Sequence, residues 1–266
     1  MDQITQEFSL KNKIALVTGA TGHLGQEMAI GLASAGAHVL INSRSIDKAK
    51  KKKDIIEKLG FSAEEAVFDV TNENEIKKFF TNYKNKLNIL VNNAYRGTKL
   101  GTIKTASSED YVKSYESGLV SSHNLLLSSL SGLRKAVSVD GEASVINISS
   151  MYGIVSPDLS IYSSPEASSP PFYGAVKAAL IQFTRYAAIE FGKENIRVNS
   201  ISPGPFPSAD AQKNDPELIK KIIKKVPLGR IGKEQEIRGP IIFLASKASS
   251  YINGENLIVD GGWTAQ

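Results

Sequence analysis

Short apolar runs alternate with longer helical patterns along the chain, and this alternation constrains its fold more than any other feature. The strand-like runs lie at 14–17, 38–41, 66–68, 87–91, 143–148, 196–201 and 256–259. The helical patterns between them span about 24–35, 46–59, 73–83, 109–131, 172–192, 215–225 and 234–246. Strands with few polar residues, joined through helices, pair in parallel and are covered on both faces. Because such crossovers are right-handed, the sequence predicts an α/β fold with a doubly wound parallel sheet.

No linker or shift in composition divides the 266 residues, so we expect one domain over 1–266. The chain has no cysteine, which excludes disulfides, thiolate nucleophiles and cysteine-based metal sites. Its histidines, His23, His38 and His123, are far apart and lack the spacing of metal ligands, so no metal site is expected. Catalysis by this chain must use hydroxyls, amines, carboxylates or a borrowed cofactor.

The net charge is +5, and five lysines lie within residues 48–53. A polyanion-binding patch is one interpretation of this run. No aromatic residues interleave with the lysines, and Asp54 and Glu57 follow on the same helix, so a solvated helix face is favoured and no nucleic-acid partner is expected. Residues 1–12 contain no apolar run, and no stretch approaches the ~18 apolar residues of a membrane span. The sequence therefore predicts a cytoplasmic protein without a membrane partner.

A glycine-rich turn at 18–25 joins the first strand to the first helix. Glycines there permit close backbone approach to a pyrophosphate, which the helix N-terminus also attracts, so the turn predicts a Rossmann-like dinucleotide site. After the second strand, residues 42–45 contain no acid that could bind a ribose 2′-hydroxyl. Arg44 can pair with a 2′-phosphate, which favours NADP(H) over NAD(H). A solvated loop arginine is the alternative.

Tyr173 and Lys177 are four residues apart at the start of a helix, so they share one helix face. An ammonium beside a phenol lowers the tyrosine pKa, which would suit a general acid/base for a carbonyl/alcohol pair. Ser150 follows the fifth strand, at the sheet edge where ligands bind in open α/β folds. The serine hydroxyl can hydrogen-bond the same carbonyl oxygen.

These features resemble the short-chain dehydrogenase/reductase family over almost the whole chain. The resemblance is carried by 18–25, Asp69-Val70-Thr71, Asn92-Asn93-Ala94, Ser150, Tyr173, Lys177, Arg197-Val198-Asn199, Pro203-Gly204 and Asp260-Gly261-Gly262. It implies that Ser150 orients the substrate carbonyl, Tyr173 transfers the proton, and Lys177 holds the nicotinamide ribose and tunes Tyr173. The cofactor residues that it implies are Gly19, Thr21, His23, Leu24, Ser43, Arg44, Asp69, Val70, Asn92, Ala94, Tyr173, Lys177, Pro203 and Gly204.

The chain departs from the family pattern at several positions. His23 and Tyr95 stand where the family usually has glycine, and Gly118 aligns with an asparagine that supports a water relay to the lysine. The segment between Ser150 and Tyr173 is longer than usual, and its extra residues, 157–171, are rich in serine and proline. We interpret this segment as a polar lid or pocket wall, with a surface excursion as the alternative. The expected substrate-binding residues are Tyr95, Ser150, Tyr152 and Tyr173.

A hydroxyl-rich wall suits a polyol better than an acyl chain, so the sequence predicts an NADP(H)-dependent oxidoreductase for a small, sugar-like ketone or secondary alcohol. A narrower likeness to reductases of bacterial surface-sugar pathways, such as flagellin-glycan and nonulosonic-acid synthesis, points the same way. One alternative is a 3-oxoacyl-thioester (acyl carrier protein) reductase. Another, suggested by Gly118, is a catalytically weak nucleotide-binding or scaffold protein. The resemblance also implies a homotetramer or homodimer.

Overall fold

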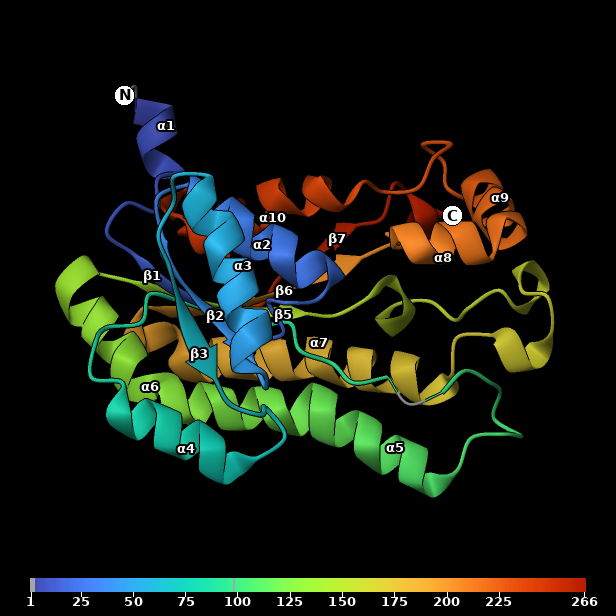
Figure 1. Cartoon of the computed structure of the whole chain (residues 1–266), viewed down its shortest axis with the longest axis horizontal. Helices are drawn as coiled ribbons and strands as arrows, with labels where there is room; N and C mark the ends of the chain where they lie inside the picture. Colours follow the sequence, from blue (N-terminus) through green and yellow to red (C-terminus); the bar gives the residue numbers. More distant parts are fainter. Residues whose placement is uncertain (1–2, 98) are drawn as a thin grey trace.

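The computed structural model describes residues 3–97 and 99–266 (Figure 1). Its seven strands form one parallel sheet in the order β3-β2-β1-β4-β5-β6-β7. The strand bounds are β1 Ile14–Val17, β2 His38–Ser43, β3 Ala63–Val67, β4 Ile89–Asn92, β5 Ala143–Ile148, β6 Ile196–Pro203 and β7 Asn256–Val259. The expected α/β doubly wound sheet is therefore confirmed.

The helices lie on both faces of the sheet. Their bounds are α1 Gln3–Glu7, α2 His23–Ser34, α3 Ile46–Lys58, α4 Glu73–Asn82, α5 Ser108–Tyr115, α6 Ser121–Asp140, α7 Pro171–Phe191, α8 Ala209–Asn214, α9 Pro216–Lys225 and α10 Arg238–Ala245. Helices α2, α3 and α10 bury one hydrophobic cluster against the sheet, while α4, α6 and α7 bury a second cluster against the opposite face (Figure 1). Successive residues of each inner strand point to opposite faces of the sheet and belong to opposite clusters, as Leu16 and Val17 do in β1.

Some element boundaries differ from the expected ones. The third strand covers Ala63–Val67 rather than 66–68, because an edge strand tolerates the charged Glu64 and Glu65 that mask its pattern. The long helix expected at 109–131 divides into α5 and α6 around a π-helical turn, Glu116–Val120, and continues to Asp140, where Gly141 ends it with a φ of 86°. The short helix α8 carries too few residues for a periodic signal.

The strand order reverses beside β1, which pairs with β2 on one side and with β4 on the other. In open α/β sheets, ligands bind beyond the carboxyl ends of the strands at such a reversal. The residues that follow Val17 and Asn92 are therefore placed together at one edge. Within residues 3–97 and 99–266, we find no helix of sufficient length and apolarity to cross a bilayer.

Candidate active site

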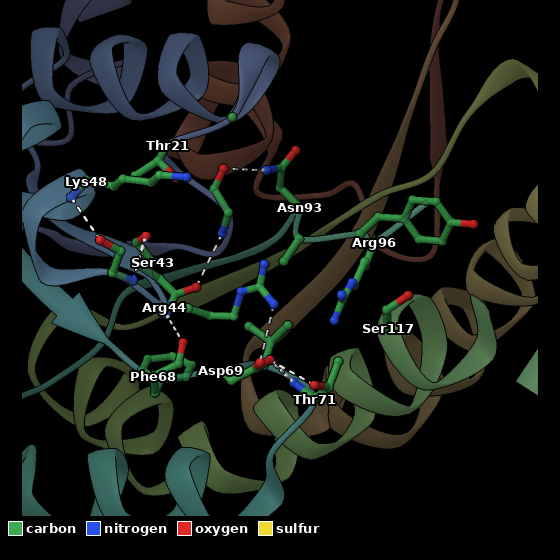
Figure 2. Close-up of a pocket in the computed structure, with 17 residues that line it drawn as sticks. Thr21, Ser43, Arg44, Lys48, Phe68, Asp69, Thr71, Asn93, Arg96 and Ser117 are labelled. Carbon is green, nitrogen blue, oxygen red and sulfur yellow. Dashed lines mark hydrogen bonds and ion pairs between the residues drawn. The ribbon is translucent and has the colours of Figure 1, made fainter. Parts of the chain in front are cut away.

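A cavity of about 590 Å³ opens at the carboxyl edge of β1, β2 and β4 (Figure 2). Its lining comes from the glycine-rich turn, the end of β2, the segment after β3 and the segment after β4. The lining residues are Gly19, Thr21, Gly22, Asn42, Ser43, Arg44, Ser45, Lys48, Phe68, Asp69, Val70, Thr71, Asn93, Ala94, Tyr95, Arg96 and Ser117. The fold thus brings segments from 19 to 117 around one space.

The glycine-rich turn is packed so closely at Gly19 and Gly25 that neither position has room for a side chain. Gly19 has a φ of 62°, and a Cβ on Gly25 would lie 2.3 Å from the Gly19 carbonyl oxygen. The Asn93 side-chain amide donates to the Thr18 carbonyl at 2.9 Å, which fixes the turn against the end of β4. The backbone and the N-terminus of α2 therefore form a cradle that fits the pyrophosphate of a dinucleotide.

Three cations lie around the same cavity on separate elements: Arg44 after β2, Lys48 in the first turn of α3, and Arg96 after β4 (Figure 2). The Arg44 side chain is 60% exposed and its Nη1 lies 3.7 Å from the Asp69 carboxylate. Burial raises the pKa of Asp69, but hydrogen bonds from Thr71 and the Arg44 charge outweigh it, so the net pKa is lowered. Among the described residues, neither Lys48 Nζ nor Arg96 has an ion-pair partner.

The cofactor residues expected from the sequence fall into two groups in the structure. Those that line the cavity are Gly19, Thr21, Ser43, Arg44, Asp69, Val70 and Ala94. Those outside its lining are His23, Leu24, Asn92, Tyr173, Lys177, Pro203 and Gly204.

Each residue of the second group has other contacts. Asn92 is 4% exposed and its amide donates to Asn147 Oδ1 at 2.8 Å, while the adjacent Asn93 faces the cavity. The His23 ring lies 3.1 Å from the Phe206 carbonyl oxygen and 3.0 Å from Glu234, so it connects α2 to the segments after β6 and before α10. Leu24 packs against the core. Pro203 ends β6, and the Gly204 N–H donates to the Val259 carbonyl.

Sequence reasoning missed Lys48 and Arg96. Lys48 belongs to the lysine run, which is otherwise as expected: Lys50 and Lys51 are exposed, while Lys53 pairs with Glu65 at 3.1 Å. The available signal for Lys48 was its place in the first turn of a helix that follows the β2 end. Arg96 carried no such signal, because only the packing after β4 directs it toward the cavity.

Ser150, Tyr173 and Lys177 are brought together by the packing of α7 on the segment after β5. A Cβ on Gly174 would lie 2.7 Å from the Tyr152 carbonyl oxygen, and a Cβ on Gly153 would lie 2.8 Å from the Lys177 backbone. Glycine at both positions therefore permits this close contact. The Ser149 hydroxyl donates to the Lys177 carbonyl at 2.8 Å and holds the helix in register with β5.

Lys177 is 4% exposed, and its Nζ donates to the Ile148 carbonyl at 2.7 Å. Burial lowers its pKa to about 8. The expected lowering of the Tyr173 pKa is wrong for this structure, since burial raises that pKa and the Ser150 hydroxyl only partly opposes it as a hydrogen-bond partner. The ammonium lies 5.8 Å from the Tyr173 ring centroid and donates to Ile148, so desolvation of the phenolate dominates.

The long segment after Ser150 is anchored rather than loose. Ile161 joins Met151, Val226 and Trp263 in a third hydrophobic cluster, and Asp158 forms an ion pair with Lys225 at the end of α9. The Tyr162 and Tyr152 hydroxyls are 2.9 Å apart.

Beside this segment lies a groove of about 540 Å³, lined by residues of 101–105 and 156–171. The exposed side chains of Ile103 and Leu159 contribute to its walls, together with Pro157, Pro165 and Pro171. The segment expected as a polar lid or pocket wall therefore also presents apolar surface to this groove. Proline rings and aliphatic side chains face the groove beside the hydroxyls.

Residues 19–264 match the family model described as Enoyl-(Acyl carrier protein) reductase. The chain belongs to the short-chain dehydrogenase/reductase family. It is 32% identical to the 2-dehydro-3-deoxy-D-gluconate 5-dehydrogenase of Dickeya dadantii, over 99% of this chain and 100% of that protein. As a member of this family, the chain is an NAD(P)-dependent dehydrogenase that acts on CH–OH groups.

Two solved structures of dehydrogenases extend the comparison. A gluconate 5-dehydrogenase from Burkholderia cenocepacia, in complex with NADP and tartrate, superposes with a TM-score of 0.87 at 28% identity, over 99% of this chain and 100% of that one. A 7α-hydroxysteroid dehydrogenase complexed with NADH superposes with a TM-score of 0.83 at 31% identity, over 98% of both chains. The fold therefore accommodates either nicotinamide cofactor.

Proposed function

We propose that the chain is an NADP(H)-dependent oxidoreductase that interconverts a ketone and a secondary alcohol on a polar, sugar-like substrate. The observation that carries this proposal is the meeting of Ser150, Tyr173 and Lys177 at the carboxyl edge of the sheet, beside Tyr95 of the cavity lining. When bound, the nicotinamide would give or accept the hydride. The protein would supply the proton and the geometry.

Each catalytic side chain has a role that follows from its position. Burial raises the pKa of Tyr173 further above neutral, so the phenol carries a proton that it can donate to a carbonyl oxygen during reduction. Ser150 lies within hydrogen-bond reach of the phenol and would donate a hydrogen bond to the same carbonyl oxygen. Lys177 places a positive charge behind Tyr173 and stabilises the phenolate that forms after proton transfer.

The preference for NADP(H) rests on charge. Arg44, Lys48 and Arg96 would face the phosphates of a bound dinucleotide, with Asp69 as the acid paired to Arg44. The 2′-phosphate adds negative charge where Arg44 and Lys48 lie, because both follow the end of β2. The Burkholderia relative is in complex with NADP, which supports the preference for NADP(H). The hydroxysteroid relative is in complex with NADH, so the experiment below compares both cofactors.

A sugar acid or polyol is the substrate class that the relatives favour, since two of those described above are named for gluconates. The finer likeness to surface-sugar reductases stays a prediction. The groove lined by Ile103 and Leu159 favours a second candidate, the acyl-thioester reductase, because those walls suit an acyl chain better than a polyol.

The test is initial-rate spectrophotometry with NADPH and NADH against a panel of keto-sugar acids, ketoses and 3-oxoacyl thioesters. We expect turnover with the sugar compounds and a preference for NADPH of tenfold or more, on the order of one charge-assisted phosphate contact. Faster turnover of 3-oxoacyl thioesters would select the second candidate. Tight NADPH binding without turnover on any substrate would instead favour the scaffold alternative.

We also propose that residues 1–266 act as one domain in a cytoplasmic homodimer or homotetramer. Exposed apolar side chains on α6 and α7, namely Leu127, Tyr186 and Ile189, support an interface there. Size-exclusion chromatography with light scattering tests it, and a monomer at micromolar concentration would refute it.

A further inference from the structure

Tyr95 lies between the cofactor cavity and the catalytic lysine. It follows β4 and lines the cavity, and its ring centroid is 5.2 Å from that of Tyr173. The Nζ of Lys177 lies 5.0 Å from the Tyr95 ring centroid, nearer than to the Tyr173 ring. An ammonium at this distance over an aromatic face is attracted by the ring quadrupole.

The environment of Lys177 leaves few other groups to stabilise its charge. Its Nζ donates to the Ile148 carbonyl of β5, and no carboxylate among the described residues forms an ion pair with it. The titratable groups that face it are Tyr173 on its own helix and Tyr95 on the segment after β4. The Tyr95 ring is therefore a major electrostatic partner of a cation that burial destabilises.

Gly118 makes room for this ring. It lies in the π-helical turn between α5 and α6, and a Cβ there would lie 2.8 Å from Val176 Cγ2 and 3.4 Å from Tyr95 Cδ2. An alanine Cβ at position 118 would clash with Val176 and meet the ring at an ordinary contact distance, whereas a larger side chain would press on the ring as well. Gly118 stands where the family pattern has the asparagine that supports a water relay to the lysine. In this structure the Tyr95 ring packs against that position.

The hydroxyl of Tyr95 fixes the orientation of the ring. It lies 3.0 Å from the Oγ of Ser114, a buried residue of α5 whose hydroxyl also donates to the Phe172 carbonyl at 3.3 Å. Phe172 is adjacent to Tyr173 on α7. The contacts from Tyr95 through Ser114 to Phe172 therefore hold the ring against α7, the helix that carries Tyr173 and Lys177.

We propose that Tyr95 is a positioning residue whose ring face stabilises the charged form of Lys177 beside Tyr173, and that the small Gly118 leaves the space in which the ring packs. This inference rests on the proposed function only for its effect on turnover. The stabilisation of the ammonium belongs to the protein without cofactor or substrate. It reassigns Tyr95 from a residue that shapes the substrate pocket to one that acts through the lysine.

The test is an NMR titration of the lysine side chains, labelled with ¹³C at Cε, in the cofactor-free protein. The Lys177 signal is expected to titrate with a midpoint near 8, well separated from exposed lysines at about 10.4. The signal is assigned by its loss in Lys177→Arg. In Tyr95→Leu the midpoint should fall by about one unit, because the cation–π contact is lost at a buried site. Tyr95→Phe keeps the ring and should stay within about 0.3 units of the wild type.

Tyr162→Leu is the matched control, since it removes a tyrosine that contacts Tyr152 rather than Lys177, and its midpoint should not move. If Tyr95→Leu fails to fold, Tyr95→Met fills a similar volume without a π face and should give the same fall. Gly118→Leu places a larger side chain against the ring and should lower the midpoint by displacing it. An unchanged or higher midpoint in the folded Tyr95→Leu or Tyr95→Met variant would overturn the proposal, and an unchanged midpoint in Gly118→Leu would overturn the role of Gly118.

The same variants then give a readout on turnover. In the reduction direction, activity that needs the ammonium is lost as pH rises through the Lys177 pKa. The alkaline limb of kcat should therefore move to lower pH in Tyr95→Leu and stay in place in Tyr95→Phe. A residue with only a structural role would lower kcat equally at every pH. Because the titration needs no substrate, a wrong substrate class would leave it intact.

Discussion

At one end of the site, Lys177 is 4% exposed, bonded to a strand carbonyl and covered by an aromatic ring. At the other end, the Arg44 side chain is 60% exposed and lies 3.7 Å from the Asp69 carboxylate. A buried charge has few partners, so each of them has a large effect. An exposed charge is screened by water and salt, so its effect is smaller and shared with neighbours. We therefore expect substitutions at the two ends to differ in size and in salt dependence.

The largest effect is expected at Tyr173. Tyr173→Phe removes the proton donor and keeps the ring packing against Tyr95, so kcat for the reduction should fall by roughly 10²–10⁴-fold. NADPH affinity, measured by fluorescence titration, should change by less than about threefold because the phosphate-binding cations are untouched. A variant that kept the wild-type rate would remove Tyr173 from the mechanism.

Lys177→Met should affect activity and stability in opposite directions. We expect kcat to fall by roughly a hundredfold, because the charge that stabilises the phenolate is lost. The folded protein at pH 7 should gain on the order of 1–2 kcal/mol in free energy of unfolding, since burial lowers the lysine pKa from 10.5 to about 8 and charging it there is unfavourable.

The sign of that stability difference is checked by pH. Between about 8 and 10.5, the unfolded wild type binds more protons than the folded one, so wild-type stability rises with pH in that window relative to the methionine variant. Urea unfolding at pH 7 and pH 10 should therefore show the advantage of Lys177→Met shrinking at the higher pH. An advantage that grew with pH would mean that folding raises the pKa of Lys177 above its value in the unfolded chain instead of lowering it.

A smaller effect is expected at the exposed end. Arg44→Ala should raise the KM for NADPH by about tenfold and leave the KM for NADH within about twofold, because only the 2′-phosphate loses a charge-assisted contact. Lys48→Ala should act in the same direction and more weakly. Raising the salt concentration should reduce the difference between wild type and variant, in contrast to Tyr173→Phe. Equal losses with both cofactors would place Arg44 away from the 2′-phosphate.

The smallest effect is expected where the wall segment meets α9. Asp158→Asn breaks an exposed ion pair with Lys225, while Ile161 and Val226 still hold the two elements together. We expect a fall in Tm of no more than about 2 °C and a KM change within about threefold. Ile161→Ala removes a buried side chain of the third cluster and should disturb both quantities more. The reverse order of effects would make the ion pair the main anchor.

Much of the fold and the site follows from local chemistry in the sequence. Alternating apolar runs and helices require a covered parallel sheet, and a glycine-rich turn before a helix places a phosphate cradle at its edge. The i and i+4 spacing puts Tyr173 and Lys177 on one face of α7 wherever that helix lies. Charges in an edge strand, such as Glu64 and Glu65 in β3, hide the pattern there.

Tertiary structure decided what sequence spacing could not encode. It placed Lys48 in the cavity lining and left Lys50 and Lys51 outside it, and it placed Asn93 rather than Asn92 there. It buried the phenol of Tyr173 enough to raise its pKa despite the nearby ammonium. It also packed Tyr95 against Gly118, 23 positions away. Spacing fixes which residues share an element, whereas desolvation and ring contacts depend on which elements pack together, and only the folded chain determines that.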